Sequence, residues 1–351
     1  MQDAALLAEA WWRRRAPRKN VLLSALPLAA TLAHVLWRHA FYGEWVPNTY
    51  FAKHVAAWPE AGRRYLESFV LEYALWIWAA VIAGALVMCL CRRGWWRERR
   101  VASDLAVLVL IAHAGYYTFI IGGDHFEYRV YSHLILLIFI SLLWALDRLR
   151  ARWWAAAGVF VVVIAASWPI PWIHWELTFH IPRDAPTWRL RRKVAPHPPA
   201  FARGYGEKFD RLQDWLILHY DCMRHEEHRN FLFSREDIYA PRSIGERTPA
   251  EGFPVIAGDA IGYLAWVLPH VNVIDRLGLN DWVIAHNPIH HRGERTMAHD
   301  RGPPPGYVEC FEPNVTLLAD RVVVAPRAQP LTADRIRKCE ATFAAAVTRR
   351  R

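Results

Sequence analysis

The sequence predicts an α-helical membrane protein of about five transmembrane helices, followed by a small extracytoplasmic α/β domain. Hydrophobic residues make up 54% of the 351 residues, which is too apolar for a disordered chain. Charged residues still make up 22%, which is too many for membrane spans alone. The basic excess lies in the apolar half, because residues 1–171 carry a net charge of +7 and residues 172–351 a net charge of +3.

Five uninterrupted apolar stretches occupy the first half of the chain. Each has about 17–23 residues, enough to cross a hydrocarbon core of about 30 Å as a helix. A backbone in lipid must satisfy its own hydrogen bonds, so we expect helices. The predicted spans are 21–37, 69–91, 101–121, 130–146 and 154–172. The predicted organisation is a cytoplasmic N-terminus over 1–20, a transmembrane domain over 21–172 and an extracytoplasmic domain over 173–351.

The Lys and Arg residues indicate the orientation. The connections on one side of the predicted spans hold 13 of them, and the connections on the other side hold 5. By the positive-inside rule the N-terminus is cytoplasmic and the C-terminal region lies outside an inner (cytoplasmic) membrane. A nucleic-acid-binding protein carries its Lys and Arg residues on a polar surface, whereas here the basic excess accompanies apolar spans. We therefore expect the lipid bilayer as a partner and no nucleic acid.

The C-terminal region has a different pattern. Residues 206–220 have the apolar spacing of a helix, and Thr332 is a suitable cap for a helix over 332–348. Short apolar runs bounded by Gly, Pro, Asn and Asp are typical of strands. These runs are 254–257, 271–274, 282–284 and 321–325. Strands that alternate with helices predict a small α/β domain.

Three cysteines lie in the C-terminal region, where the predicted location permits disulfides. They are Cys222, Cys310 and Cys339. The pairing that we favour is Cys310 with Cys339, although spacing alone does not fix connectivity. The region has no Cys-x-x-Cys pair, which argues against a zinc site.

The segment 122–129, Gly-Gly-Asp-His-Phe-Glu-Tyr-Arg, joins the third and fourth predicted spans. Titratable residues beside lipid are costly unless they are paired or used. We take Asp124 and Glu127 as candidate catalytic carboxylates, and His125 and Arg129 as candidate substrate-binding residues. The alternative is a hydrated turn in which Arg129 pairs with Asp124 or Glu127.

Two further regions supply candidate substrate-binding residues. In the first predicted outer loop, Asn48, Tyr50 and Lys53 offer donors, and a lysine can hold a phosphate as a point charge. The alternative for that loop is an interfacial segment with a snorkelling lysine. In the C-terminal region the candidates follow predicted strands, where α/β folds usually place ligands. They are Asp259, Asp275, Asn280 and Asp281. The alternative for them is ordinary turn chemistry.

Histidines gather in two groups of the C-terminal region. The groups are His286, His290, His291 and His299, and separately His225 and His228. Neither matches the His-Glu-x-x-His arrangement of zinc proteases, and solvated histidines in polar loops are commoner than ligands. We therefore predict no cofactor, and the sequence gives no support for a divalent metal.

Four segments in order carry a resemblance to a known family. They are 47–53 (Pro-Asn-Thr-Tyr-Phe-Ala-Lys), 122–129, 274–281 (Ile-Asp-Arg-Leu-Gly-Leu-Asn-Asp) and 298–308 (Ala-His-Asp-Arg-Gly-Pro-Pro-Pro-Gly-Tyr-Val). Together they resemble the polytopic GT-C glycosyltransferases related to the mycobacterial terminal arabinofuranosyltransferase.

The resemblance implies an arabinosyltransferase-like enzyme with a polyprenyl-phosphate sugar donor and a cell-envelope glycan acceptor, working at the outer membrane face. Such chemistry needs a base for the acceptor hydroxyl and cations for the departing phosphate. Lys53 and Arg129 match motif positions and suit the phosphate, and Asp124 and Glu127 are nearby carboxylates.

The chain departs from the family in its first outer loop. The family has further spans before this region and an acidic pair in that loop, whereas this loop offers only Glu44, Glu60 and Glu67. We therefore expect the chain to correspond to the C-terminal two-thirds of such a transferase. The alternatives are a partner that carries the missing half, or a non-catalytic membrane protein whose outer domain binds envelope glycan or a partner protein. A transporter is less consistent, since no inverted repeat is seen.

Overall fold

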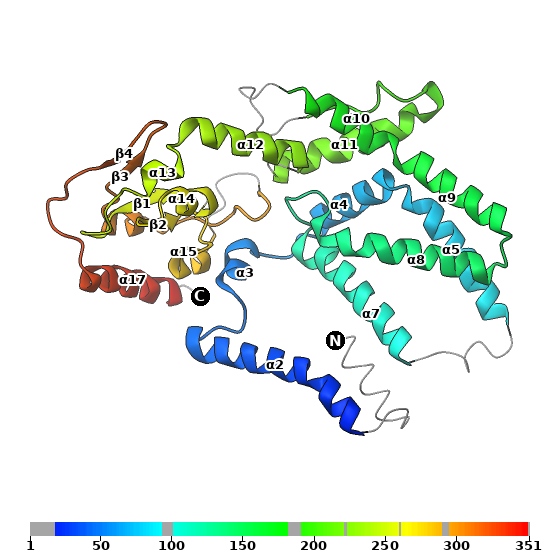
Figure 1. Cartoon of the computed structure of the whole chain (residues 1–351), viewed down its shortest axis with the longest axis horizontal. Coiled ribbons are helices and arrows are strands. Elements are labelled where there is room, and N and C mark those ends of the chain that lie inside the picture. The colour runs from blue at the N-terminus through cyan, green and yellow to red at the C-terminus, as the bar shows by residue number, and fades with distance from the viewer. Residues whose placement is uncertain are drawn as a thin grey trace. The chain divides into compact units, whose positions relative to one another are not determined.

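The computed structural model describes residues 18–92, 101–181, 191–220, 223–259, 261–289 and 295–349 (Figure 1). The chain divides into two compact units. The first unit comprises Met1–Val46, Trp58–Gly123 and Tyr128–Pro171. The second unit comprises Pro47–Ala57, Asp124–Glu127 and Trp172–Arg351. Two short segments from the N-terminal half therefore belong to the same compact unit as the C-terminal region.

The first unit is helical. Its described elements are α2 (Arg18–Tyr42), α4 (Pro59–Glu72), α5 (Leu75–Cys91), α7 (Val101–Gly115), the π-helical η1 (Tyr116–Ile121), η2 (Arg129–Tyr131), α8 (Ser132–Arg148) and α9 (Trp153–Ser167). Apolar side chains stay exposed along several of these helices, Leu108, Leu136 and Val161 among them. Such faces suit a hydrocarbon environment.

Three helical stretches are long and apolar enough to cross a membrane: Asp104–Ile121, Arg129–Arg148 and Trp153–Leu177. An 87° bend separates the helices α4 and α5. This pair is a fourth candidate stretch if it is counted as one broken span. These stretches agree with the predicted spans 101–121, 130–146 and 154–172, and the bent pair covers 69–91. The predicted span 21–37 falls on α2. Among the described residues, α2 is not one of the helical stretches that are long and apolar enough to cross a membrane. The helices are compatible with an integral membrane protein.

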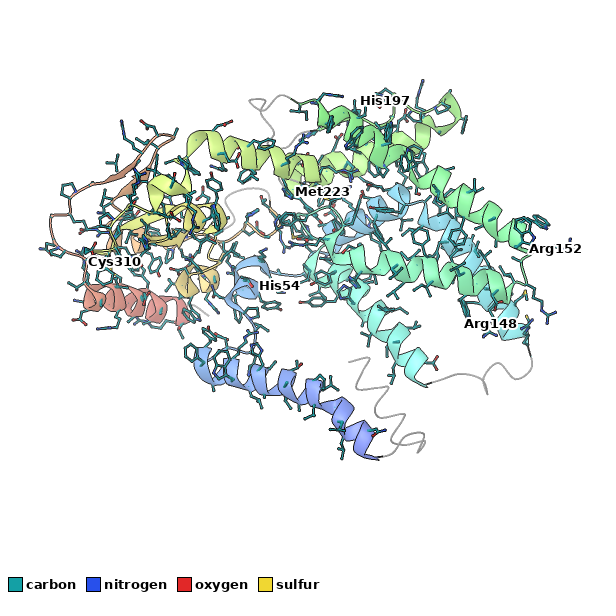
Figure 2. All side chains as sticks on the ribbon, viewed as in Figure 1. His54, Arg148, Arg152, His197, Met223 and Cys310 are labelled. Carbon is teal, nitrogen blue, oxygen red and sulfur yellow. A yellow bond between two sulfur atoms is a disulfide. The ribbon has the colours of Figure 1, made fainter. Side chains whose placement is uncertain are left out.

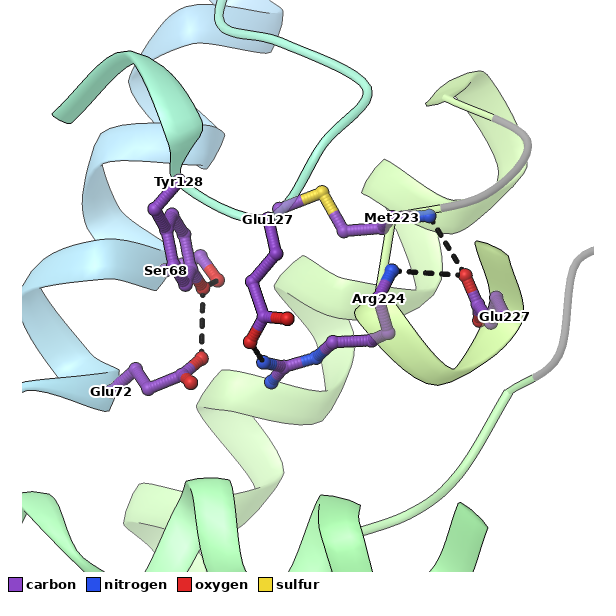
Figure 3. Close-up of polar contacts among 7 residues, drawn as sticks. All are labelled: Ser68, Glu72, Glu127, Tyr128, Met223, Arg224 and Glu227. Atoms are coloured by element: carbon purple, nitrogen blue, oxygen red, sulfur yellow. Dashed lines mark hydrogen bonds and ion pairs between the residues drawn. The ribbon is translucent and has the colours of Figure 1, made fainter. Parts of the chain in front are cut away.

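Polar side chains form hydrogen bonds beside the bend between α4 and α5. Ala74 lies at the break in the left-handed region, with φ 48°. Glu72, at the end of α4, is fully buried and accepts a hydrogen bond of 3.0 Å from the Tyr128 hydroxyl (Figure 3). That hydroxyl also lies 2.5 Å from the Ser68 Oγ. A buried carboxyl is tolerated where hydrogen bonds replace its hydration.

The second unit combines short helices with two small sheets. Its described elements are α3 (Asn48–Lys53), most of α10 (Pro169–Phe179), η3 (Ala200–Ala202), α11 (Arg203–Tyr220), α12 (His225–Ile238), α13 (Arg242–Gly245), β1 (Val255–Gly258), α14 (Ile261–Val267), β2 (Asn272–Asp275), α15 (Trp282–His286), α16 (Tyr307–Cys310), β3 (Val315–Leu317), β4 (Val322–Val324) and α17 (Ala333–Thr348). It is richer in helix than the predicted α/β domain.

The strands β1 and β2 pair in parallel through the α14 crossover, and β3 pairs with β4 antiparallel. Three predicted strands, 254–257, 271–274 and 321–325, correspond to β1, β2 and β4. The predicted strand 282–284 is wrong, since it lies in α15. Asp281 starts that helix by accepting a 2.9 Å hydrogen bond from the Ile284 amide. Such a cap satisfies an amide that the first helical turn leaves unpaired.

The C-terminal helix α17 is held by the features that the sequence predicts. The Thr332 hydroxyl accepts a 3.2 Å hydrogen bond from the Arg335 amide and caps the helix. A disulfide joins Cys310 in α16 to Cys339 in α17, which confirms the favoured pairing (Figure 2). Both helices pack into a core with Val255 of β1. The third cysteine, Cys222, lies outside the described residues.

Candidate functional site

The site is built around the loop that follows β2. The Asp275 carboxylate is buried and accepts hydrogen bonds from the backbone amides of Leu277 (3.0 Å) and Leu279 (3.1 Å). Burial raises the pKa of Asp275, and these two amide donors partly oppose the rise. Asn280 ties the loop back to β2, because its amide donates to the Val273 carbonyl at 2.7 Å. The loop therefore has a fixed conformation.

The loop also requires a glycine at one position. Gly278 has φ +82°, and a Cβ there would lie 2.7 Å from the Ala285 backbone nitrogen. Asp281, at the end of the loop, accepts a 2.7 Å hydrogen bond from the Tyr307 hydroxyl in addition to capping α15. Burial raises the pKa of Asp281. The carboxylates at 275 and 281 thus both serve the shape of this loop.

The first predicted outer loop contacts the same element. The Asn48 side-chain amide donates to the carbonyls of Gly278 (2.8 Å), Leu279 (3.3 Å) and Asp281 (3.2 Å). Helix α3 packs on α15, where the rings of Phe51 and His286 lie 4.2 Å apart between centroids. Two segments more than 200 residues apart in sequence thus form one structure.

Two arginines donate hydrogen bonds to the backbone of the segment 47–57. Arg295 donates to the carbonyls of Ala56 (2.5 Å) and Ala57 (3.3 Å) and contacts Asp300. Arg301 donates to the Phe51 carbonyl at 3.2 Å and to the Asn287 carbonyl. Hydrogen bonds from these arginine side chains to backbone carbonyls therefore join the segment 295–301 to the segment 47–57.

His54 lies near the positive charges of Arg295 and Arg301. Its pKa is lowered, first by burial and then by the charges of Arg295 and Arg301. The neutral imidazole is favoured in the folded chain. The ring lies beside the Tyr50 ring, with 5.2 Å between centroids and an angle of 36° between the ring planes.

Acid is expected to weaken the second unit through His54. Because the folded-state pKa lies below the unfolded value of about 6.5, the contribution of His54 is complete above about pH 6.5 and is lost as the pH falls. A His54→Gln variant should therefore lose less stability than the parent chain between about pH 6.5 and 4.5. Thermal unfolding of both proteins at several pH values measures this. Equal pH slopes would contradict it, and the exposed His197→Gln serves as the control.

The segment Asp124–Glu127 brings a carboxylate and an imidazole together. The Asp124 Oδ1 lies 3.3 Å from the His125 Nδ1, and their side chains are 9% and 13% exposed. The His299 ring lies 5.5 Å from the His125 ring, and the His228 ring lies 6.3 Å from it. Two imidazoles from segments far apart in sequence thus lie near His125, which itself lies beside a carboxylate.

Glu127 is engaged in an ion pair. The Arg224 guanidinium donates to the Glu127 Oε1, and the Arg224 side chain is only 3% exposed (Figure 3). The turn that carries this arginine is fixed by Glu227, whose Oε2 accepts the backbone amides of Met223 (2.7 Å) and Arg224 (3.1 Å). The pair joins the segment 124–127 to the start of α12.

All the predicted site residues except Arg129 belong to the second unit. Lys53 is half-buried at the end of α3. Asp259 is 76% exposed, with Arg276 4.0 Å away, and its charge adds to the rise that burial causes in the pKa of Asp275. Arg129 belongs to the first unit, where its carbonyl accepts a 2.8 Å hydrogen bond from Ser132.

The sequence did not single out the arginines at 224 and 295 or the histidine at 54. Arg224 adjoins the noted group His225 and His228, and Arg295 precedes the motif at 298–308, so proximity to a motif is the available signal. Among the described residues, no group of three or more His, Cys, Asp or Glu side chains suits a metal ion. His290 and His291 lie outside those residues.

The arrangement offers an imidazole beside a carboxylate, several cations and a rigid loop. These groups suit proton transfer and the stabilisation of an anion. In comparisons with known proteins, no family model, no curated protein and no solved structure matches the chain.

Proposed function

We propose that the chain is an integral membrane glycosyltransferase-like protein. It transfers a sugar from a polyprenyl-phosphate donor to a cell-envelope glycan at the outer face of the inner membrane. The observation that carries the proposal is the meeting, in one compact unit, of the segments 47–53, 124–127, 274–281 and 298–308. These segments also carry the resemblance to the GT-C family.

The chemistry of transfer matches the side chains in these segments. An acceptor hydroxyl attacks the anomeric carbon, the bond from that carbon to the phosphate oxygen breaks, and the lipid phosphate leaves. Lys53 is the proposed cation for the phosphate, because it occupies a motif position of the family. The pair Asp124 and His125 provides groups that can accept a proton.

The membrane placement has two supports. The helices of the first unit suit a bilayer, and the surplus of Lys and Arg in alternate connections favours a cytoplasmic N-terminus. The disulfide between Cys310 and Cys339 is of the kind that persists in an oxidising compartment. The charge distribution and the disulfide together favour an extracytoplasmic second unit.

Substitution of Asp124 by Ala is expected to reduce sugar transfer at least about 100-fold while the chain still folds. The readout is transfer from a short-chain isoprenyl-phosphate arabinofuranose to an arabinofuranosyl disaccharide, with each variant purified in detergent. Asp320→Ala and Arg321→Ala are matched controls, since these residues are 73% and 65% exposed on the turn between β3 and β4. The controls should keep the parent rate.

The rival is a membrane protein without catalysis, whose second unit binds envelope glycan or a partner protein. It predicts no transfer by the parent chain, although the disaccharide acceptor could still bind. If the parent chain transfers sugar and the Asp124→Ala variant loses only stability, the site assignment is wrong while the function stands.

A further inference from the structure

We propose that Arg301, together with Arg295 and His54, forms a site for a phosphate group beside the last turn of α3. The inference deepens the proposed function, on which it rests for the lipid phosphate as the source of the ligand. It adds Arg301 to Lys53 as a cation for that phosphate. All four residues belong to the second unit.

The Arg301 side chain is fixed through two of its three nitrogens. Its Nε donates to the Phe51 carbonyl at 3.2 Å, and its Nη1 donates to the Asn287 carbonyl. Its Nη2 has no acceptor within the described part of the chain and is open to solvent. A guanidinium held in this way presents a charged donor that is already oriented, so an anion that binds to it pays little further ordering of the side chain.

Positive charge exceeds negative charge around this guanidinium. Among the described residues, Asp300 is the carboxylate whose charge acts on Arg301, and its Oδ2 also lies 3.3 Å from the Arg295 Nε. Its Oδ1 accepts the Thr296 amide at 2.7 Å. Burial lowers the pKa of Arg301, and Asp300 opposes this change. Because one carboxylate serves two partly buried guanidiniums, a bound anion would stabilise the charged form of both.

His54 supplies a neutral donor in the same place. Burial lowers its pKa first, and the charges of Arg295 and Arg301 lower it further, so both guanidiniums lie close enough to act on its ring. A neutral imidazole donates one hydrogen bond from its protonated nitrogen. The site thus combines charged and neutral donors, which suits a group with several acceptor oxygens.

The excess of cations favours a phosphate monoester over a diester. The lipid donor of the proposed reaction is a diester whose phosphate carries a single negative charge. The isoprenyl phosphate that leaves is a monoester, and a monoester carries a charge of about −1.5 to −2 near pH 7. Cations at this place therefore stabilise the leaving group more than the intact donor. Inorganic phosphate shares this chemistry, so both sources enter the test.

Titration calorimetry of the purified full chain in neutral detergent measures the binding. The probes are farnesyl phosphate, inorganic phosphate and farnesol, which has the same chain without the phosphate. The parent chain should bind farnesyl phosphate and should not bind farnesol at the same concentrations. Arg301→Gln should weaken the binding of farnesyl phosphate by about 10- to 100-fold, because it removes a charge-assisted hydrogen bond.

Arg327→Gln is the matched control for a purely structural role. Like Arg301, Arg327 is partly exposed and donates to backbone carbonyls, here those of Glu312 (2.9 Å) and Phe253 (2.9 Å). This variant should keep the parent affinity for farnesyl phosphate. Arg301→Lys should bind with an affinity between those of the parent and Arg301→Gln, because lysine keeps the charge without the planar fork. If Arg301→Gln does not fold, the affinity of Arg301→Lys decides.

The two phosphate sources are separated by their affinities. Tighter binding of farnesyl phosphate than of inorganic phosphate identifies the lipid phosphate as the ligand, and equal binding identifies free phosphate. The proposal is overturned if neither phosphate binds the folded parent chain, if the variants at 301 keep the parent affinity, or if Arg327→Gln causes an equal loss. If the parent chain binds phosphate through Arg301 but transfers no sugar, the proposed function fails while the phosphate site stands.

Discussion

Replacement of Arg224 by Met is expected to lower the free energy of unfolding of the second unit by about 1–3 kcal/mol. The Arg224 side chain is 3% exposed and its guanidinium pairs with Glu127. The Glu127 side chain is 27% exposed, so its carboxylate loses a charged hydrogen-bond donor but stays partly hydrated. The guanidinium also lies 5.7 Å from the Phe209 ring centroid, so packing around it changes as well.

Urea unfolding of the full chain in detergent, followed by Trp fluorescence, measures this effect. Arg337→Met is the matched control, because Arg337 pairs with Asp334 on the surface of α17 and is 70% exposed. It should change the unfolding free energy by less than about 1 kcal/mol. The double variant Arg224→Met with Glu127→Gln should be less destabilised than the sum of the two single variants. A loss below about 1 kcal/mol for Arg224→Met would contradict the buried pair.

Removal of the disulfide is expected to cost about 3–4 kcal/mol, because it closes a loop with a sequence separation of 29 residues. The double variant Cys310→Ser with Cys339→Ser measures this without creating a free thiol at either position. Cys339 is buried in the core that α17 shares with β1, so the change also places a hydroxyl in that core. Cys91→Ser is the control, since Cys91 is free and exposed. A cost no larger than that of the control would show that the disulfide adds nothing to the fold.

Local chemistry made several features of the fold predictable. Thr332 caps α17 because its hydroxyl is one residue before the helix, and β1 and β2 are recognisable as short apolar runs between turn residues. The segment 282–284 is apolar like a strand but lies in α15. There the competing signal was Asp281, whose side chain satisfies an amide of the first helical turn.

The candidate site was predictable in part. The motif residues Asn48, Asp275, Asn280 and Asp281 meet in the second unit, yet their hydrogen bonds mainly shape the loop after β2. The pairing of Asp124 with His125 follows from their adjacency. The partners Arg224 and His299 could not be predicted, because contacts over long sequence separations depend on tertiary packing that periodicity does not encode.

Transfer of sugar by the purified chain tests the central claim most directly. The full chain is incubated with a short-chain isoprenyl-phosphate arabinofuranose and an arabinofuranosyl disaccharide, and mass spectrometry quantifies the isoprenyl phosphate and the lengthened glycan. The account predicts that both products form in equal amounts, and that Asp124→Ala abolishes both while Asp320→Ala does not. Recovery of the intact donor from the folded parent chain, with the acceptor unchanged, would contradict it.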